Sequence, residues 1–424
     1  MLSKEQNELI TRTGPGTPLG EMMRCYWVPA LQSSELPGPD CPPVQVKILG
    51  EELVAFRDSQ GRLGLLEEHC AHRGTSLFYG RNEEGGLRCI YHGWKYDVHG
   101  HVLETPAEPA GSTFHERVRV RAYATHEVGG MIFAYLGEGR PPLFPNYEWT
   151  TIAPEHTFVA KSLLECNYLQ GLEGECDSAH LSFLHRMLDP NEHFLYKADT
   201  HPEYHTEDTD FGVRLIALRH LPENKTYVRV TAFLMPLACA LPVGGAVDGF
   251  DVHFYTPIDD THAWRFDFSF KRSQPYAGKD NRRRNFVDAA FRKLQNVDNH
   301  YLQDREKQRT ENFTGMGPIF PVHDGCATET MGALYDRSRE HLGSSDKAVI
   351  AMRRYLLDAI ARFQQGATPP HVITDPALND MRHAESLSGI IDGDDWHAHY
   401  PQLVTSAAEV PAEVAPVSGG GVLF

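Results

Sequence analysis

Two short runs in the first quarter of the chain each combine one cysteine with one histidine. The first, CAHRG, contains Cys70 and His72; the second, CIYHGW, contains Cys89 and His92, and sixteen residues separate the two pairs. Two thiolates and two imidazoles in this order are typical of a Rieske [2Fe–2S] cluster, in which histidines replace two cysteines on one iron. The two pairs therefore predict a one-electron carrier.

A structural zinc ion is the alternative, because zinc also accepts two cysteines and two histidines. Zinc fingers, however, group the cysteines first and the histidines later, whereas here the order alternates. Gly74 and Gly93 lie beside the two pairs, as expected where the backbone approaches cluster sulfurs closely. The alternating order of the cysteines and histidines and the two adjacent glycines therefore favour the iron–sulfur cluster over zinc.

A second group of possible metal ligands lies in residues 165–185, where Asp177, His180 and His185 have the spacing D-x2-H-x4-H. Two histidines and a carboxylate are the donor set of non-haem Fe(II) oxygenases. Residues five apart lie about 140° apart around an ideal helix. A single ion can therefore take both imidazoles only if the segment, which looks helical at first, bends or ends between them. On spacing alone, two ordinary histidines remain the alternative.

Composition excludes several classes of partner. The chain has 424 residues, 41% of them hydrophobic, and a formal net charge of −17. An acidic protein of this kind is a poor match for nucleic acid or for an anionic membrane surface, since both are negatively charged. The sequence has no run of 18 apolar residues and no signal-peptide pattern, so we expect no membrane span.

The cysteines indicate the redox compartment. Eight cysteines in a chain of this length are not a disulfide framework. We expect the six outside the two motifs to be mostly buried free thiols in a reducing cytoplasm, namely Cys25, Cys41, Cys166, Cys176, Cys239 and Cys326.

The pattern of strands and turns divides the chain. Ser3 and Gln6 form a capping box for a short helix through Thr11, and residues 44–92 alternate as strands around a hairpin turn at 58–61. A proline-rich segment, 139–145, marks a domain boundary. Strand-like runs then predict an antiparallel sheet, with later helices at 285–309 and 345–365. The second has an apolar stripe of Val349, Ile350, Met352, Leu356, Ile360 and Phe363.

The combined motifs resemble the large subunit of Rieske non-haem iron aromatic-ring oxygenases, in the branch of phthalate dioxygenase. The resemblance covers nearly the whole chain, including GPGTPLGEMMRCYWVPAL, EEGGLRCIYHGWKYD, LEGECDSAHLSFLH and MGALYDRSREHLGSSDKAVIAMRR. It implies an α+β fold, with an all-β Rieske domain and a larger catalytic domain of helices on an antiparallel sheet (helix-grip type). The expected parts are an N-terminal segment 1–40, the Rieske domain 41–145, the catalytic domain 146–402 and a flexible tail 403–424.

The resemblance also implies roles for single residues. Cys70, His72, Cys89 and His92 would bind the cluster, and His180 and His185 would bind a catalytic Fe(II). Asp177 resembles the family's bridging carboxylate, which links a cluster histidine to an iron histidine of a neighbouring subunit. The carboxylate ligand would be Asp324, although His323 stands where the branch often has glutamine. Asp336 is the other candidate, and it could instead pair with a neighbouring arginine or cap a turn.

The resemblance also implies an oxygenase component that receives electrons from NADH through a reductase with a flavin and a plant-type [2Fe–2S] domain. With O2 it would hydroxylate an aromatic carboxylic acid, by cis-dihydroxylation or alternatively by oxidative O- or N-demethylation. A Rieske electron-transfer protein without oxygenase activity and a zinc-stabilised binding module are the alternatives from other classes. A bridging Asp177 further implies a homotrimer, or a hexamer of two trimers.

A buried substrate carboxylate must be paired, and arginine suits that task. Basic residues interrupt the predicted strands at Arg214, Arg219, Arg229 and Arg265. Each could simply face solvent on an alternating strand. We expect Arg214 and Arg265 to bind the substrate.

Overall fold

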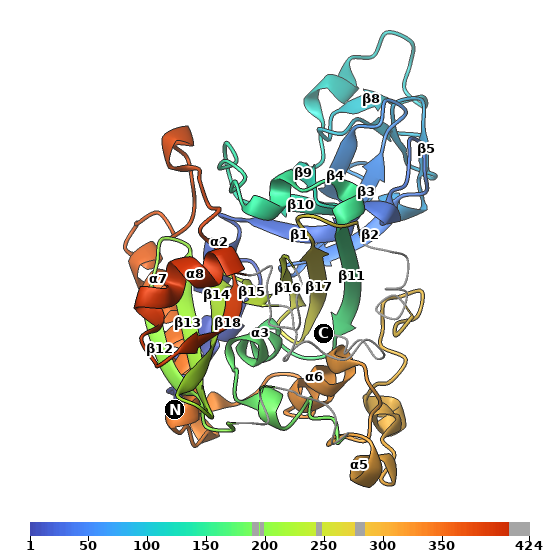
Figure 1. The fold of residues 1–424 in the computed structure, drawn as a ribbon. Coiled ribbons are helices and arrows are strands. Elements are labelled where there is room, and N and C mark those ends of the chain that lie inside the picture. Colours follow the sequence, from blue (N-terminus) through green and yellow to red (C-terminus); the bar gives the residue numbers. More distant parts are fainter. Residues whose placement is uncertain (189–194, 196–198, 243–247, 276–284, 407–424) are drawn as a thin grey trace.

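The computed structural model of the chain describes residues 1–188, 195, 199–242, 248–275 and 285–406, and the statements below concern these residues. It has two parts (Figure 1): strands β1–β10 form three small sheets, and the later strands form one large antiparallel sheet that carries helices. This arrangement confirms the predicted α+β class. The helices are α1 (Lys4–Thr11), α2 (Pro18–Met23), α3 (Tyr168–Cys176), α5 (Lys307–Thr310), α6 (Phe320–Glu329), α7 (Lys347–Gln364) and α8 (Trp396–Ser406).

The first part is built from three antiparallel sheets. One has the order β2 (Val44–Ile48), β3 (Glu51–Arg57), β4 (Leu63–Glu67). The second has the order β5 (Arg81–Glu83), β6 (Gly86–Arg88), β7 (Lys95–Tyr96), β8 (Val102–Glu104). The third has the order β1 (Trp27–Gln32), β10 (Met131–Tyr135), β9 (Ala124–Val128). The predicted turn at 58–61 joins β3 to β4, with Gly61 at φ +78°.

The second part is an eight-stranded antiparallel sheet. Its order is β11 (Thr157–Leu164), β17 (His262–Phe270), β16 (Phe250–Asp259), β15 (Ala238–Pro242), β14 (Lys225–Leu234), β13 (Gly212–Leu221), β12 (Glu203–Asp208), and β18 (Leu387–Asp392) also pairs with β14. The central strands are buried along almost their whole length. Helices and other segments therefore cover both faces of the sheet. A basic residue in these central strands does not face solvent on either side, although side chains alternate between the two faces.

Several predicted helices are confirmed. The capping box of Ser3 and Gln6 begins α1, and α7 lies within the predicted 345–365. Along α7, Val349, Met352, Leu356 and Ile360 are buried, and the helix contacts β12 and β13. Ile350 was wrongly included in the stripe. It is 44% exposed, because it lies one residue, or about 100°, away from the buried face.

The helix predicted for residues 285–309 is wrong. This segment forms turns, a 3-10 stretch Val297–Leu302 and the single turn α5. The side chain of Asp288 accepts hydrogen bonds from the backbone N–H groups of Ala290 and Arg292, and Asn296 accepts one from the N–H of Asp298. Such local bonds compete with helical ones.

Two further expectations concern composition. All eight cysteines are free thiols; Cys166, Cys176 and Cys239 are buried, whereas Cys25, Cys41 and Cys326 are half-buried. In the described part of the chain, no helix is both long and apolar enough to cross a bilayer. Helix α8 continues through Ser406, and residues 407–424 of the expected tail lie outside the described residues.

Candidate functional site

The two Cys-His pairs lie on two adjacent loops of the small-sheet part. In each loop the glycine N–H donates back to the cysteine carbonyl, from Gly74 to Cys70 at 2.8 Å and from Gly93 to Cys89 at 3.0 Å. Both glycines have positive φ, +74° and +77°, which side chains disfavour. The two loops thus bend in the same way and present their cysteines to one another.

The four side chains of the pairs converge. Cys70 and Cys89 are buried, and the rings of His72 and His92 lie 4.5 Å apart between centroids. Tyr96 Oη lies 3.1 Å from the Sγ of Cys70. Two buried thiols beside two outward imidazoles fit a [2Fe–2S] cluster with its histidine-bound iron nearest the surface.

The second candidate centre is formed by His180, His185 and Asp324. Their ligand atoms all lie within 4.8 Å of one another. Asp324 Oδ1 is 3.0 Å from His185 Nε2 and 4.0 Å from His180 Nε2. Ligands about 2 Å from one ion lie about 3–4 Å apart, so the set needs only small shifts to hold a metal.

The end of α3 makes this convergence possible. The helix stops at Cys176, Asp177 is extended (φ −88°, ψ 108°), and a short 3-10 turn spans His180–Ser182. Phe183 (φ −123°, ψ −62°) ends that turn. The expected bend between the two histidines is therefore present, and their rings lie 5.1 Å apart.

Charge stabilises the carboxylate of Asp324. Arg265 Nη1 donates to Asp324 Oδ2 at 3.3 Å. Burial raises the pKa of Asp324, but His185, Arg265 and His180 together hold it well below its ordinary value. For His185, burial outweighs this carboxylate and lowers the pKa. These shifts favour an ionised Asp324 and a neutral His185, the protonation states that bind a metal, whereas the neighbouring carboxylates of Asp177 and Asp324 outweigh burial and raise the pKa of His180.

Asp177 lies behind His180. Its Oδ2 is 3.7 Å from His180 Nδ1, and its Oδ1 accepts from the Ala179 N–H at 2.7 Å. Burial raises the pKa of Asp177, but these contacts lower it overall. Arg219, fully buried, donates from Nη2 to the Ser178 carbonyl at 2.6 Å and from Nη1 to the Ser178 Oγ at 3.1 Å. Arg219 therefore anchors the loop that carries Asp177.

The two arginines expected to bind substrate lie in different places. Arg214 is not among the residues that line the metal pocket; it donates to Glu207 on the neighbouring strand at 3.0 Å. Arg265 lines the pocket, but its guanidinium contacts Glu175, Asp267 and Asp324. It therefore balances carboxylates of the protein itself.

Sequence reasoning named Arg229 without assigning it a role, and it missed Asp251 and His253 of the pocket. Arg229, 6% exposed, lines the pocket with Asp251 and His253. His253 Nδ1 contacts Glu175 Oε1 at 2.8 Å. No motif marks these residues, because they come from strands β14 and β16, which become neighbours of the metal ligands only in the folded sheet. Asp336 lies elsewhere and caps a 3-10 turn by accepting from the Ser338 N–H.

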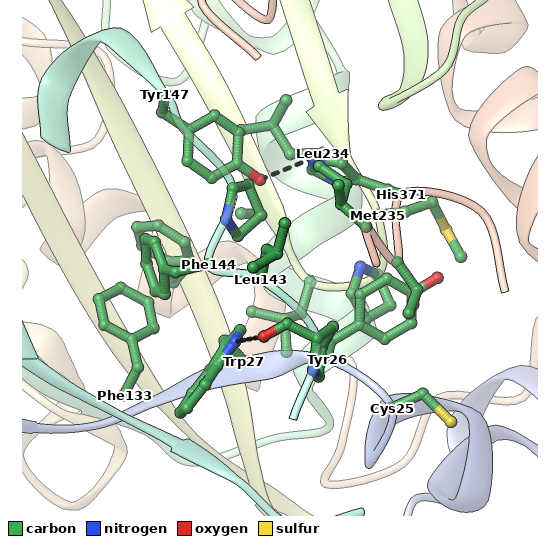
Figure 2. Close-up of a pocket in the computed structure, with 18 residues that line it drawn as sticks. Cys25, Tyr26, Trp27, Phe133, Leu143, Phe144, Tyr147, Leu234, Met235 and His371 are labelled. Carbon is green, nitrogen blue, oxygen red and sulfur yellow. Dashed lines mark hydrogen bonds between the residues drawn. The ribbon is translucent and has the colours of Figure 1, made fainter. Parts of the chain in front are cut away.

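A second cavity, shown in Figure 2, lies where β1 meets the large sheet and does not contain the candidate ligands. Aromatic and apolar side chains line it, among them Trp27 and Phe144. Its polar groups are paired: Trp27 Nε1 donates to the Pro142 carbonyl at 3.0 Å, and Tyr147 Oη lies 3.1 Å from His371 Nε2. We interpret it as space between packed parts, not as a reaction site.

Fold and donor sets together define a protein with an iron–sulfur loop pair and a separate two-histidine, one-carboxylate centre. Comparisons with known proteins agree. Residues 26–124 match the Rieske [2Fe-2S] domain family, and residues 134–415 match the family described as LigXa C-terminal domain like.

Relatives of known activity extend over most of the chain. The phthalate 4,5-dioxygenase oxygenase subunit of Pseudomonas putida is 39% identical, covering 86% of this chain and 88% of its own. The 3-chlorobenzoate-3,4-dioxygenase oxygenase subunit of Comamonas testosteroni is 34% identical, covering 88% of this chain and 92% of its own. The 5,5'-dehydrodivanillate O-demethylase oxygenase subunit of a Sphingobium species is 30% identical, covering 89% of this chain and 85% of its own. The crystal structure of dicamba monooxygenase bound to dicamba shares the fold, with a TM-score of 0.57 at 17% identity (81% and 99% covered).

The chain belongs to the Rieske non-haem iron oxygenases, and it is an oxygenase subunit with a [2Fe–2S] Rieske cluster and a mononuclear non-haem iron as cofactors.

Proposed function

We propose that this oxygenase hydroxylates an aromatic carboxylic acid with O2, by cis-dihydroxylation of the ring. One observation carries the proposal: the centre of His180, His185 and Asp324 opens into a pocket that a buried arginine, Arg229, also lines. The names of several relatives specify aromatic acids, including phthalate, 3-chlorobenzoate and phenoxybenzoate.

The two donor sets support the following assignment of the cofactors to residues. Cys70 and Cys89 would hold one iron of the cluster, and His72 and His92 the other. His180, His185 and Asp324 would hold the mononuclear iron. Such an iron, when bound, supplies open positions for O2 activation with electrons from the cluster.

The protein's own groups then have distinct tasks. Arg265 keeps the Asp324 carboxylate ionised and oriented. Asp177 Oδ2 faces His180 Nδ1 at 3.7 Å, and this negative charge favours a proton on Nδ1, which leaves Nε2 of His180 for the metal beside Asp324. Arg229, which already donates from Nη1 to the Pro242 carbonyl at 3.2 Å, would in addition pair with the substrate carboxylate, because a carboxylate in a buried pocket requires a cation. In this proposal Arg229, and not Arg214, is the arginine that binds the substrate.

Assembly completes the electron path. The small sheets that carry the cluster loops lie at the top of the molecule in Figure 1, and helices α3 and α6 lie in its lower part. Large apolar side chains are exposed in the second cluster loop, Ile90 to 58% and Tyr91 to 54%, and in the 3-10 turn after the first loop, Tyr79 to 66%. We propose that a second copy covers them in a homotrimer or a hexamer of two trimers, so that Asp177 connects the cluster of one subunit to the iron of the next. Light scattering should show three or six subunits; a monomer with full turnover at low concentration would contradict the proposal.

The electron donor in this proposal is a flavin and [2Fe–2S] reductase that oxidises NADH in the cytoplasm. One solved structure with a similar fold is an oxygenase in complex with a ferredoxin, that of carbazole 1,9a-dioxygenase (TM-score 0.54). A reductase, or a reductase together with a ferredoxin, is therefore the kind of donor to supply in assays.

Oxidative demethylation of an aromatic acid is the second candidate, favoured by the O-demethylase among the relatives. Product analysis with a panel of aromatic acids, 18O2, NADH and a reductase separates the two. A cis-diol carries both labelled atoms, whereas demethylation releases formaldehyde. An Arg229→Met variant should raise KM for the acid while its uncharged analogue is unaffected. Iron-loaded, reducible enzyme that converts no aromatic acid would refute the proposal.

A further inference from the structure

Helix α6 contacts the ring of His185 on three sides. The Phe320 ring stacks on it at 4.2 Å between centroids with 19° between planes. His323 Nδ1 lies 3.3 Å from His185 Nδ1, and Asp324 Oδ1 lies 3.0 Å from His185 Nε2. Positions i, i+3 and i+4 share one face of a helix. One helical turn thus supplies a wall, a hydrogen-bond partner and a carboxylate to the same imidazole.

The hydrogen positions follow from the partners. His323 is fully buried, and its Nε2 lies 2.8 Å from the Gly317 carbonyl oxygen. A carbonyl can only accept, so Nε2 of His323 carries a proton and donates. A neutral imidazole has a single N–H, which leaves a lone pair on His323 Nδ1. The proton between the two Nδ1 atoms therefore belongs to His185, which leaves the Nε2 lone pair of His185 available to a metal held together with Asp324.

We propose that His323 is a positioning residue, which fixes His185 as its Nδ1–H tautomer and thereby directs Nε2 of His185 toward the mononuclear iron. The inference rests on the proposed iron ligands. It also makes the two histidines unequal: His180 has the carboxylate of Asp177 behind it, whereas His185 has a neutral ring. A carboxylate raises the basicity of a ligand histidine more than a neutral acceptor does.

Gly317 provides the fixed end of this hydrogen-bond chain. Its φ of +80° is in the left-handed region that favours glycine. The turn before α6 therefore directs a carbonyl group back toward His323 on the helix. The chain from the Gly317 carbonyl through His323 to His185 is entirely uncharged.

Two substitutions of His323 separate its hydrogen bonding from its volume. His323→Gln retains one acceptor and one donor group, and His323→Leu removes both at similar size. The measurement is the Fe(II) affinity of enzyme whose mononuclear iron has been removed, by competition with a chelator, together with the rise in Tm on adding Fe(II). We expect the Leu variant to bind Fe(II) about ten- to hundredfold more weakly, the usual effect of losing such a partner. Its Tm rise shrinks in parallel, and the Gln variant stays near wild type.

His185→Ala is the reference variant. If wild type binds no Fe(II) beyond the cluster, or His185→Ala does not weaken binding, the proposed iron site itself is wrong. If His185→Ala loses Fe(II) while His323→Leu binds as wild type, the iron site stands and the role of His323 is refuted. Equal losses in the Gln and Leu variants would also refute it. His323→Met replaces the Leu variant if the latter does not fold.

Discussion

Arg265 donates a hydrogen bond from Nη1 to Oδ2 of Asp324 at 3.3 Å, while the other carboxylate oxygen faces His185. The same guanidinium donates to Asp267 at 2.6 Å and is only 7% exposed. One buried cation thus offsets carboxylates that would otherwise repel one another beside the metal site.

Arg265→Met should therefore destabilise the protein and weaken iron binding together. Removing one partner of a buried ion pair costs about 3–5 kcal/mol, because the other charges stay buried. Thermal unfolding and iron analysis of the purified variant measure both effects. Arg265→Lys keeps the charge but not the planar guanidinium, so its Tm and iron content should lie between those of wild type and those of Arg265→Met. Wild-type Tm and iron content in the Met variant would show that the guanidinium is dispensable.

Asp324→Ala and Asp336→Ala form a matched pair that tests the carboxylate ligand. Asp324→Ala should retain a reducible cluster, lose the mononuclear iron and form no product. Asp336→Ala should keep iron and turnover, since it loses only a cap worth about 0.5–2 kcal/mol. Iron content, cluster reduction and product are measured in each variant. The reverse pattern would transfer the ligand role to Asp336.

Cys89→Ser should abolish the visible spectrum of the cluster and all NADH-driven turnover, because a serine hydroxyl is a poor substitute for a thiolate on iron. Cys41→Ser, at a half-buried thiol outside the loops, is the control and should keep both. Unchanged absorbance in Cys89→Ser would remove Cys89 from the cluster ligands.

The half-buried histidine of the cavity in Figure 2, His371, should make stability depend on pH. Burial lowers the pKa of His371 from 6.5 to about 4. Between these values the unfolded chain binds a proton that the folded chain does not, so stability is full above pH 6.5 and is lost toward pH 4, by about 1.4 kcal/mol per unit. The Tm advantage of wild type over His371→Gln should shrink between pH 7 and 5. A constant difference would contradict this assignment.

The parts of the molecule that local spacing determines were predictable from the sequence. The Cys-His loops, the α7 stripe and the bend required between His180 and His185 all depend on residues close in the chain. The helix expected at 285–309 failed because Asp288 and Asn296 bind the backbone locally, which composition alone does not reveal.

The surroundings of the iron site could not be predicted in the same way. Arg219, Arg229 and Arg265 look alike on alternating strands, yet one anchors the Asp177 loop, one lines the pocket and one pairs with Asp324. Their roles depend on which strands become neighbours. Asp324 itself was expected from family resemblance, and only the orientation of α6 shows that His323 contacts His185 as well.

Asp177→Asn examines the coupling of the two centres. Asparagine keeps the shape but carries no charge, and it cannot accept N–H donors from both imidazoles without a conformational compromise, because only one of its two head-group atoms is an acceptor. No direct ligand is lost, so both centres should still load with iron and the cluster should still reduce.

The most direct test of the account is a single-turnover experiment on pre-reduced Asp177→Asn enzyme, with iron counted and cluster oxidation followed alongside product. The account predicts about three irons per chain, as for a [2Fe–2S] cluster plus one mononuclear iron. Product should form at least about tenfold more slowly than in wild type, the lower end of effects from groups behind a metal ligand. Loss of the mononuclear iron would make Asp177 a ligand in place of Asp324, and an unchanged rate would mean that electrons reach the iron without Asp177.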